Sequence, residues 1–240
     1  MAKKLVDYII SSCEFITPEL IERIEGARDG CQNLGIGVYS DELFEKKRNR
    51  RPIRPYDERA FIVSHLMGVD FVFKVNDEEN FVIKQESIFF DNVKTKQFHI
   101  GYAPGTYDLL HQGHIEHLTE AFSQCDILIV GINDDDLVYS YKKKQPMMTA
   151  EVRANIVSKL DFVDSVYIAH ELERHNANEW IKKRYGQGID AVFIGSDWQG
   201  QDLHNAEGLK IVFTDRDPEK MKTRSSTYYR EMWKKTQDPK

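Results

Sequence analysis

The sequence FHIGYAPGTYDLLHQGHIEHLTEAFSQCDILIVGI, residues 98–132, decides the fold class of this chain. The apolar run at its start, residues 98–103, predicts a β-strand, and residues 114–124 carry apolar side chains at helical spacing. A second apolar run, residues 127–132, predicts another β-strand. A strand, a helix and a strand in this order predict a parallel, right-handed βαβ unit.

The pattern continues on the C-terminal side of this unit. An acidic short helix, a basic loop and another helix are expected after residue 132. Apolar runs and helical patterns then alternate, which predicts a strand at 165–169, a helix at 177–187, strands at 190–195 and 209–214, and a last helix at 225–235. We therefore predict an α/β domain with a parallel sheet flanked by helices.

A match at one fixed offset relates the N-terminal part of the chain to this region. Arg59 pairs with Arg153 (153 − 59 = 94), and Pro52 pairs with Pro146 at the same offset. Without a gap, the offset also pairs Cys31 with Cys125, Gly37 with Gly131, Asp41 with Asp135, and Asp70 with Asp164. Shared strand patterns would align apolar residues but would not keep these types in register. We interpret the match as an internal duplication.

The first copy is shorter than the second. Its strands are expected at 5–10, 34–39 and 70–75, and nothing after them matches the later strands of the second copy. The sequence thus predicts a smaller degenerate α/β half-domain at residues 1–75, a connector at 76–96 and a complete domain at 97–240.

Composition limits the class of protein. The net charge of −6 argues against a nucleic-acid partner, and no apolar run approaches the ~20 residues of a membrane span, so we expect no membrane insertion. The first 15 residues read as a strand, not as a signal peptide. Cys13, Cys31 and Cys125 form an odd set without metal-ligand spacing, which fits small buried side chains in a cytoplasmic, reducing compartment. We expect no metal site made by protein side chains alone.

The strongest chemical signal is the pair of histidines between the predicted strand and helix. His111 and His114 flank Gly113 at a strand-to-helix turn, beside the free N–H groups of a helix start. Such an end favours anions, and a glycine there lets a phosphate approach closely. Two histidines at this spacing usually occur by chance. Here the glycines, the preceding strand and the following helix argue against a chance occurrence.

These residues resemble the H-x-G-H signature of the cytidylyltransferase superfamily, and the chain is most similar to its glycerol-3-phosphate cytidylyltransferases over residues 97–235. Three further motifs follow in the family's order. They are the lysine-bearing loop 142–144 with Arg153, the segment GSDWQG (195–200), and Arg216 followed by TRSST (223–227). The resemblance implies a Rossmann-like nucleotidyltransferase fold.

The resemblance also implies an activity: CTP and a small phosphorylated alcohol, such as glycerol 3-phosphate or another polyol or amino-alcohol phosphate, would give a CDP-alcohol and pyrophosphate. Mg²⁺ would bind through the triphosphate. The catalytic residues implied are His111, His114, Lys142, Lys144 and Arg216. Substrate-binding residues would be Gly105, Thr106, Tyr107, Asp108, Gly113, Arg153, Gly195, Asp197, Trp198, Arg224, Ser225, Ser226 and Thr227.

Several of these residues have a structural alternative. Ser225 could be a helix cap, the three lysines a solvated loop, Trp198 part of the core and Asp108 a turn cap. Arg153 could be a structural ion-pair partner, because Arg59 keeps the arginine in a copy that has no histidines. His99 and His117 lie outside the motif and receive no role.

Two alternatives to the CTP reaction stay open. An adenylyltransferase would share the histidine motif and use ATP, and a non-catalytic nucleotide-binding regulator would not need the complete set of motifs. Ser196 stands where the cytidylyltransferase superfamily usually has the first of two aspartates, and the basic stretch at 215–227 replaces a shorter, glycine-containing link in that family. The identity of the acceptor therefore stays open.

The first copy has Thr17-Pro18-Glu19-Leu20 where the second has the histidine motif. A glutamate there would repel a phosphate, so this copy is expected to be non-catalytic. It could serve as an intramolecular pseudo-partner or extend a homodimer. The arginine-rich segment 48–59 is expected to be a solvated loop, or alternatively to reach a neighbouring active site.

Overall fold

The computed structural model describes residues 4–79, 96–172, 174–201, 208–215 and 218–237. Among these residues, no helix combines the length and the hydropathy that a membrane span requires. The chain divides into two compact units, each described separately below. Unit 1 comprises residues 1–90, 159–161 and 227–240, and unit 2 comprises residues 91–158 and 162–226.

Unit 2 contains a five-stranded parallel sheet with the strand order β6-β5-β4-β7-β8. Its elements are, in chain order, β4 (Phe98–Gly105), α4 (Gln112–Phe122), β5 (Cys125–Asn133), α5 (Asp135–Lys142), α6 (Ala150–Val157), β6 (Ser165–Ala169), α7 (His175–Tyr185), β7 (Ala191–Gly195), the 3-10 turn η1 (Ser196–Trp198), β8 (Lys210–Thr214) and α8 (Pro218–Thr223). The predicted α/β class with a parallel sheet is confirmed.

The strand order places β4 at the centre, where the chain changes its direction of growth. The chain adds β5 and β6 on one side of β4 and then β7 and β8 on the other. In open α/β sheets, ligands bind beyond the carboxyl ends of the strands at such a switch point. The topology therefore predicts a ligand site at the carboxyl ends of β4, β5 and β7.

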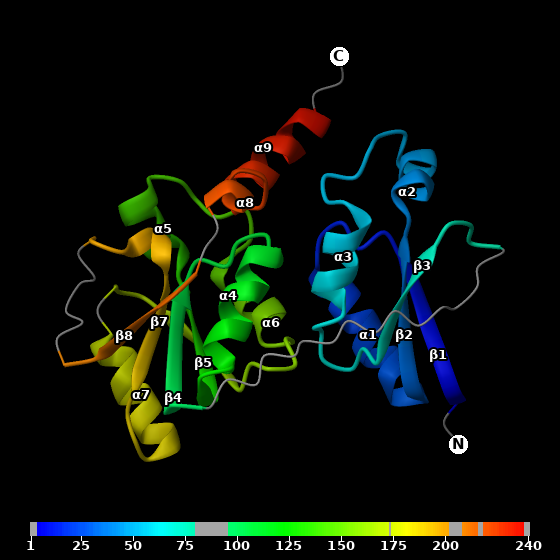
Figure 1. The fold of residues 1–240 in the computed structure, drawn as a ribbon. Helices are drawn as coiled ribbons and strands as arrows, with labels where there is room; N and C mark the ends of the chain where they lie inside the picture. The colour runs from blue at the N-terminus through cyan, green and yellow to red at the C-terminus, as the bar shows by residue number, and fades with distance from the viewer. Residues whose placement is uncertain (1–3, 80–95, 173, 202–207, 216–217, 238–240) are drawn as a thin grey trace. The chain divides into compact units, whose positions relative to one another are not determined.

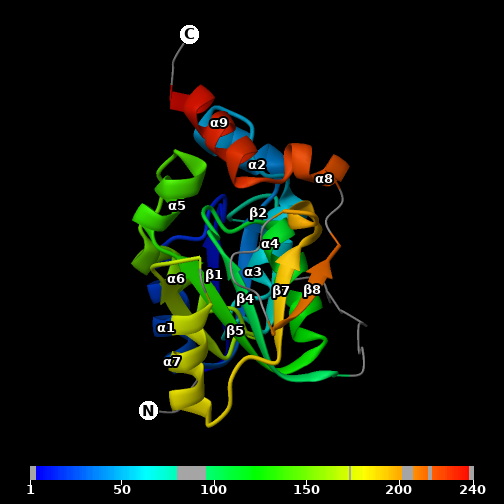
Figure 2. The same ribbon diagram turned by 90° about the vertical axis from the view of Figure 1, so that its left-hand side faces the viewer.

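Helices cover both faces of this sheet. Ala177 and Ile181 of α7 pack in one cluster with Ile100, Tyr102 and Ile129 of the central strands. Helices α4 and α6 lie on the opposite face, as Figures 1 and 2 show. Because both faces are covered, the central strand β5 is mostly buried.

Unit 1 contains a three-stranded parallel sheet in the order β1-β2-β3. Its elements are β1 (Lys4–Ser11), α1 (Pro18–Gly30), β2 (Cys31–Tyr39), α2 (Asp41–Arg48), α3 (Tyr56–Val63) and β3 (Phe71–Val75), with most of α9 (Ser226–Gln237). Each of the first six begins 94 residues before its counterpart in unit 2, for example β1 at residue 4 and β4 at residue 98. Such agreement is what a duplication predicts.

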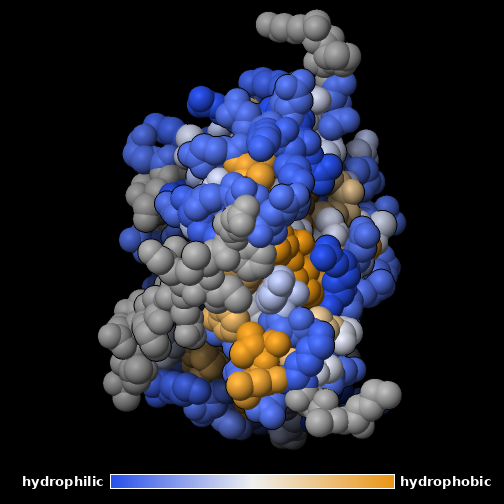
Figure 3. All heavy atoms as spheres, turned by 90° about the vertical axis from the view of Figure 1, so that its right-hand side faces the viewer, coloured by the Kyte–Doolittle hydropathy of each residue, from blue (hydrophilic) through white to orange (hydrophobic). Residues whose placement is uncertain are grey.

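Unit 1 lacks a counterpart of β7 among the described residues. Strand β4 pairs with β5 and β7, whereas β1 pairs with β2 alone in the part of the chain that the structure describes. Leu5 and Val6 of β1 are 68% and 44% exposed. Figure 3 shows hydrophobic residues at the surface among polar ones. This sheet agrees with the prediction that the first copy is incomplete. The predicted connector lies mostly outside the described residues. The predicted domain limits stay a proposal.

The arginine-rich segment of unit 1 is packed, not solvated. Arg54 and Arg59 are fully buried, and Arg50 pairs with Glu14 at 2.5 Å. Of the alternatives that the sequence left open, the solvated loop is wrong for these three side chains. Arg51, by contrast, is 87% exposed. All three cysteines are free and buried, as expected, and burial raises the pKa of Cys13 to about 11.

A close contact within unit 2 gives a first testable prediction. A Cβ atom added to Gly131 in β5 would lie 2.1 Å from Oη of Tyr102. Gly131→Ala must therefore displace the Tyr102 ring, and such overpacking typically costs about 1–3 kcal/mol. Urea unfolding should show this loss, whereas Gly26→Ala, which meets nothing within 4 Å, should not destabilise the protein. Equal stability of the two variants would contradict the packing described here.

Candidate active site

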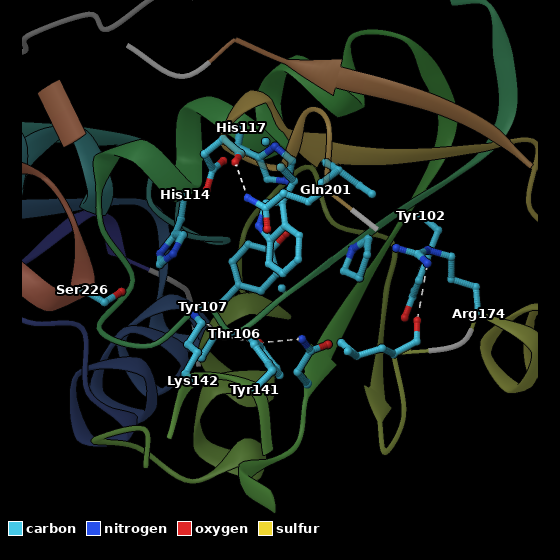
Figure 4. A pocket seen from close by; sticks show the side chains of 18 of the residues that line it. Tyr102, Thr106, Tyr107, His114, His117, Tyr141, Lys142, Arg174, Gln201 and Ser226 are labelled. Carbon is cyan, nitrogen blue, oxygen red and sulfur yellow. Dashed lines mark hydrogen bonds between the residues drawn. The ribbon is translucent and has the colours of Figure 1, made fainter. Parts of the chain in front are cut away.

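A cavity of about 330 Å³ lies at the carboxyl ends of β4, β5 and β7, at the switch point of the unit 2 sheet. Figure 4 shows the side chains that surround it. Nine of the residues predicted from the sequence line it: Gly105, Thr106, Tyr107, His114, Lys142, Gly195, Asp197, Trp198 and Ser226. Residues from four separate motifs therefore meet in one space.

The histidine motif begins helix α4. His111 is the N-cap residue with an extended backbone, and α4 starts at Gln112. The imidazole rings of His111 and His114 are stacked, with their centroids 3.7 Å apart. His114 lines the cavity, whereas His111 is buried against it. A Cβ atom on Gly113 would lie 3.3 Å from the His111 ring, so the glycine allows this stacking.

Lys142 reaches the cavity from the end of helix α5. Its Nζ donates a hydrogen bond to Oγ1 of Thr106 at 2.9 Å. Tyr141 joins the same network, because its hydroxyl lies 3.1 Å from Thr106 Oγ1 and accepts a hydrogen bond from Asn133 at 3.0 Å. Lys142, predicted from the sequence to lie in a lysine-bearing loop, is therefore the last residue of helix α5. Lys144, in contrast, is exposed and does not line the cavity.

The C-terminal motif contributes through Ser226. Its hydroxyl donates a hydrogen bond to the carbonyl oxygen of Asp108 at 2.6 Å, which ties the start of α9 to the turn before α4. The carbonyl oxygen of Arg224 lies 3.6 Å from the position of a Cβ on Gly113. Ser225, Thr227 and the Arg224 side chain do not line the cavity. Arg216 lies outside the described residues.

Two predicted binding residues support the walls of the site instead of lining it. The Asp108 carboxylate accepts hydrogen bonds from the backbone N–H groups of Met147 and Met148, at 3.0 and 3.1 Å. The Arg153 side chain is fully buried and donates to four groups, namely Thr106 O, Asn133 O, Met148 O and the Asp135 carboxylate. These contacts fit the alternative in which Arg153 is a structural ion-pair partner. We therefore propose that Arg153 is a brace, meaning that it holds the turns beside the cavity in place.

The GSDW segment forms the wall after β7. Asp197 and Trp198 lie in the short turn η1 and line the cavity with Gly195. The Trp198 ring also lies 6.4 Å from the Tyr141 ring, in an edge-on arrangement, and packs against the sheet cluster. Trp198 therefore both packs in the core and lines the cavity.

Sequence reasoning missed several lining residues. They are Tyr102, Pro104, His117, Asn133, Tyr141, Glu171, Leu172, Arg174, Ile194 and Gln201. Tyr102 and Asn133 stand at the ends of predicted strands, which was a usable signal. His117 was given no role, yet it lines the cavity three residues after His114, and its Nδ1 lies 2.6 Å from Oγ1 of Thr214. Arg174 follows β6 in a segment without a motif.

Charges of both signs face this cavity. Lys142 and Arg174 are cationic, and burial lowers the pKa of the Arg174 guanidinium. Glu171 and Asp197 supply carboxylates. Within the described ranges, no group of three or more His, Cys, Asp or Glu residues has the arrangement of a metal site. The lining therefore offers both cationic and acidic side chains to a polar ligand.

Comparisons with known proteins agree with this geometry. Residues 102–232 match the sequence model of the family described as "Cytidylyltransferase-like". The chain is 34% identical over 122 residues to "Bifunctional protein HldE" of Nitrobacter hamburgensis, an alignment that covers 48% of this chain and 24% of that protein. It is 30% identical over 127 residues to "Probable ethanolamine-phosphate cytidylyltransferase" of Encephalitozoon cuniculi, covering 52% of this chain and 37% of that protein.

The chain thus spans 24% and 37% of the length of these two curated relatives. A solved structure titled "Crystal structure of the lipopolysaccharide core biosynthesis protein from Thermoplasma volcanium GSS1" aligns at 23% identity with a TM-score of 0.39, over 50% of this chain and 96% of that one. The family match covers more than half of the chain and includes every strand end that forms the cavity. The chain belongs to the cytidylyltransferase-like family.

Proposed function

We propose that this protein transfers a cytidylyl group from CTP to the phosphate of a small phosphorylated alcohol and releases pyrophosphate. The observation that carries the proposal is the meeting of His114, Lys142 and Ser226 in one cavity at the switch point of the sheet. An acceptor phosphate oxygen attacks the α-phosphorus, the new P–O bond forms, and the bond to the β-phosphate oxygen breaks. The leaving electron pair goes to pyrophosphate.

This reaction needs alignment of two anions and stabilisation of developing charge, not a covalent intermediate. His114 Nε2 can donate a hydrogen bond to phosphate oxygens, and the stacked His111 ring holds its orientation. Lys142 supplies a compact positive charge, which would exchange the Thr106 hydroxyl for a phosphate oxygen when the triphosphate binds. The N-terminal end of α4, which has no side-chain cap, adds backbone N–H groups that favour an anion.

The other side of the cavity supports a polar acceptor. Glu171 and Arg174, from the segment between β6 and α7, line the cavity with Tyr102. A carboxylate, a guanidinium and a phenol can bind the hydroxyl or amino groups of a polyol or amino-alcohol phosphate. Mg²⁺ would be held by a lining carboxylate, Glu171 or Asp197, because magnesium commonly takes one or two carboxylates together with substrate phosphates. When bound, it would neutralise triphosphate charge.

The test is a pyrophosphate-release assay on the purified chain with Mg²⁺. CTP and ATP are compared, each with a panel of phosphorylated acceptors that includes glycerol 3-phosphate, phosphoethanolamine and a sugar phosphate. We expect acceptor-dependent release with CTP. Faster release with ATP would favour the adenylyl reaction, and no release with any pair would contradict a catalytic function.

A further inference from the structure

Two hydroxyl groups of unit 2, one directly after β4 and one in helix α5, form a hydrogen-bonded pair beside Lys142. Thr106 Oγ1 and Tyr141 Oη are 3.1 Å apart, and either oxygen can be the donor. Lys142 Nζ donates to Thr106 Oγ1 at 2.9 Å, and Asn133 Nδ2 donates to Tyr141 Oη at 3.0 Å. All four residues belong to unit 2 and line its cavity. Figure 4 shows Thr106, Tyr141 and Lys142 close together.

A count of protons determines what this pair of hydroxyls offers to a ligand. Each hydroxyl carries one proton, and the contact between Thr106 and Tyr141 uses one of the two. Within the described residues, no carbonyl or carboxylate oxygen accepts a hydrogen bond from either hydroxyl. One hydroxyl proton of the pair therefore remains for a ligand in the cavity.

The donors around the pair determine which proton remains. Asn133 already donates to the phenol oxygen of Tyr141, whose second lone pair is delocalised into the ring, so this oxygen is a poor acceptor for another bond. Tyr141 therefore donates to Thr106. The Thr106 oxygen then accepts from both Tyr141 and Lys142, which occupies its two lone pairs. Its own proton takes the remaining tetrahedral direction and is the one that a ligand can accept.

The groups around this chain of donors hold it in place. Arg153 donates to the Thr106 carbonyl oxygen, which fixes the backbone that carries the hydroxyl. Asn133 is the last residue of β5 and is buried. The Tyr141 ring lies edge-on to the Trp198 ring, with centroids 6.4 Å apart. The Thr106 hydroxyl is thus oriented before a ligand arrives, so less ordering remains for binding.

The corresponding corner of unit 1 holds an anionic oxygen that the chain itself supplies. There Tyr39 and Lys47 both donate to the carboxylate of Glu78. The counterparts of these three residues at the offset of 94 all line the cavity of unit 2: Asn133, Tyr141 and Leu172. Unit 1 thus has a carboxylate at the position where unit 2 has an apolar side chain and a cavity. We therefore expect the ligand of this corner in unit 2 to carry an anionic oxygen.

We infer that Tyr141 and Asn133 are positioning residues that aim the hydroxyl proton of Thr106 at a phosphate oxygen of a substrate. The inference rests on the proposed function for its choice of a phosphate. When Lys142 turns from Thr106 to the phosphate, Tyr141 stays as the partner that holds the Thr106 hydroxyl. The ligand then gains a hydrogen bond to a charged oxygen, which is stronger than a neutral one. This oxygen belongs either to the triphosphate or to the acceptor phosphate, and two measurements distinguish them.

Tyr141→Phe tests the inference, because it removes the hydroxyl and keeps the ring. The first measurement is the dissociation constant of inorganic pyrophosphate with Mg²⁺, by calorimetry, and the second is the KM of the phosphorylated acceptor at saturating CTP. We expect one of these constants to rise about three- to tenfold, because the bond to a charged oxygen is weakened but not removed. A rise for pyrophosphate assigns the oxygen to the triphosphate, and a rise for the acceptor alone assigns it to the acceptor. No change in either constant would contradict the inference.

A double-mutant cycle tests whether Tyr141 acts through Thr106. Thr106→Val should raise the same constant about tenfold or more, because the donor itself is lost. In that background, Tyr141→Phe should change the constant by less than about twofold. Thr106→Ser keeps a hydroxyl, so it should bind as the wild type does and keep the response to Tyr141→Phe. Additive effects of Thr106→Val and Tyr141→Phe would overturn the inference, because Tyr141 would then act independently of Thr106.

Tyr185→Phe is the matched control. The Tyr185 hydroxyl also pairs with a side-chain hydroxyl of unit 2, Ser165 Oγ at 2.6 Å, but Tyr185 does not line the cavity. Its replacement should leave both constants unchanged. An effect equal to that of Tyr141→Phe would speak against the inference, because a general loss of stability would then be the cause.

The outcomes separate this inference from the proposed function. If no pair of substrates releases pyrophosphate, the proposed function fails, while the binding of pyrophosphate still tests the inference. Weaker binding by Tyr141→Phe would then support the role of Tyr141. Unchanged binding, or no binding by the wild-type protein, would refute it.

Discussion

His114→Ala is expected to lower kcat/KM for CTP-dependent pyrophosphate release about 10²–10³-fold, the range found when one preorganised transition-state donor is removed. His114 lines the cavity, and its ring is stacked on His111, so its orientation is set before substrate binds. The measurement is a steady-state assay with CTP, Mg²⁺ and the best acceptor from the screen. Most of the loss should be in kcat, because the donor acts on charge that develops in the transition state.

His99→Ala is the matched control for this prediction. His99 is exposed, lies outside the cavity and contacts Asp126 at 3.1 Å. Its replacement should leave kcat/KM within about twofold, since an exposed pair contributes little. If His114→Ala retained wild-type turnover and a wild-type unfolding transition, the assignment of the site would be wrong.

Arg153→Met should destabilise the protein by about 3 kcal/mol or more, because four acceptors lose a charged donor that is fully buried. Three of these acceptors are backbone carbonyls that shape the turns beside the cavity. Urea unfolding, followed by circular dichroism, measures the change in the free energy of unfolding. Activity should fall as well, since the Thr106 carbonyl would lose its support.

Unit 1 supplies a parallel experiment. Arg59 makes the counterparts of three of these bonds, to Arg54 O, Ser12 O and the Asp41 carboxylate. Arg59→Met should therefore cause a loss of similar size. Arg51→Met should change stability by less than about 0.5 kcal/mol, because Arg51 is exposed and its pair with Glu45 spans 3.6 Å. Stability of Arg153→Met equal to that of Arg51→Met would contradict the brace.

Local patterns predicted the fold of unit 2 well, because parallel strands that are buried on both faces appear as continuous apolar runs. The histidine turn, the GSDW segment and Ser226 were found for a related reason. Each lies at the end of a predicted strand or the start of a predicted helix. Ligand groups gather at such ends in this class of fold.

Other features depend on contacts that no local pattern encodes. Arg174 lines the cavity from the segment between β6 and α7, where the chain crosses from one side of β4 to the other to form β7. The packing of Arg54 required knowledge of α9, whose residues lie more than 170 positions later in the chain. A charged stretch such as 48–59 reads as solvated until its distant partners are known.

The buried arginines Arg59 and Arg153 lead to an expectation about sequence variation among related proteins. Arg59 lies in the unit that has no counterpart of the histidine motif, so we expect selection at that position to act on folding. If Arg153 has the same task, substitutions at the two positions should be tolerated at similar rates in related chains. Positions 17 and 111, which share a backbone turn but not a chemistry, should drift apart. An alignment of related sequences would thus distinguish, within one chain, residues retained for folding from residues retained for chemistry.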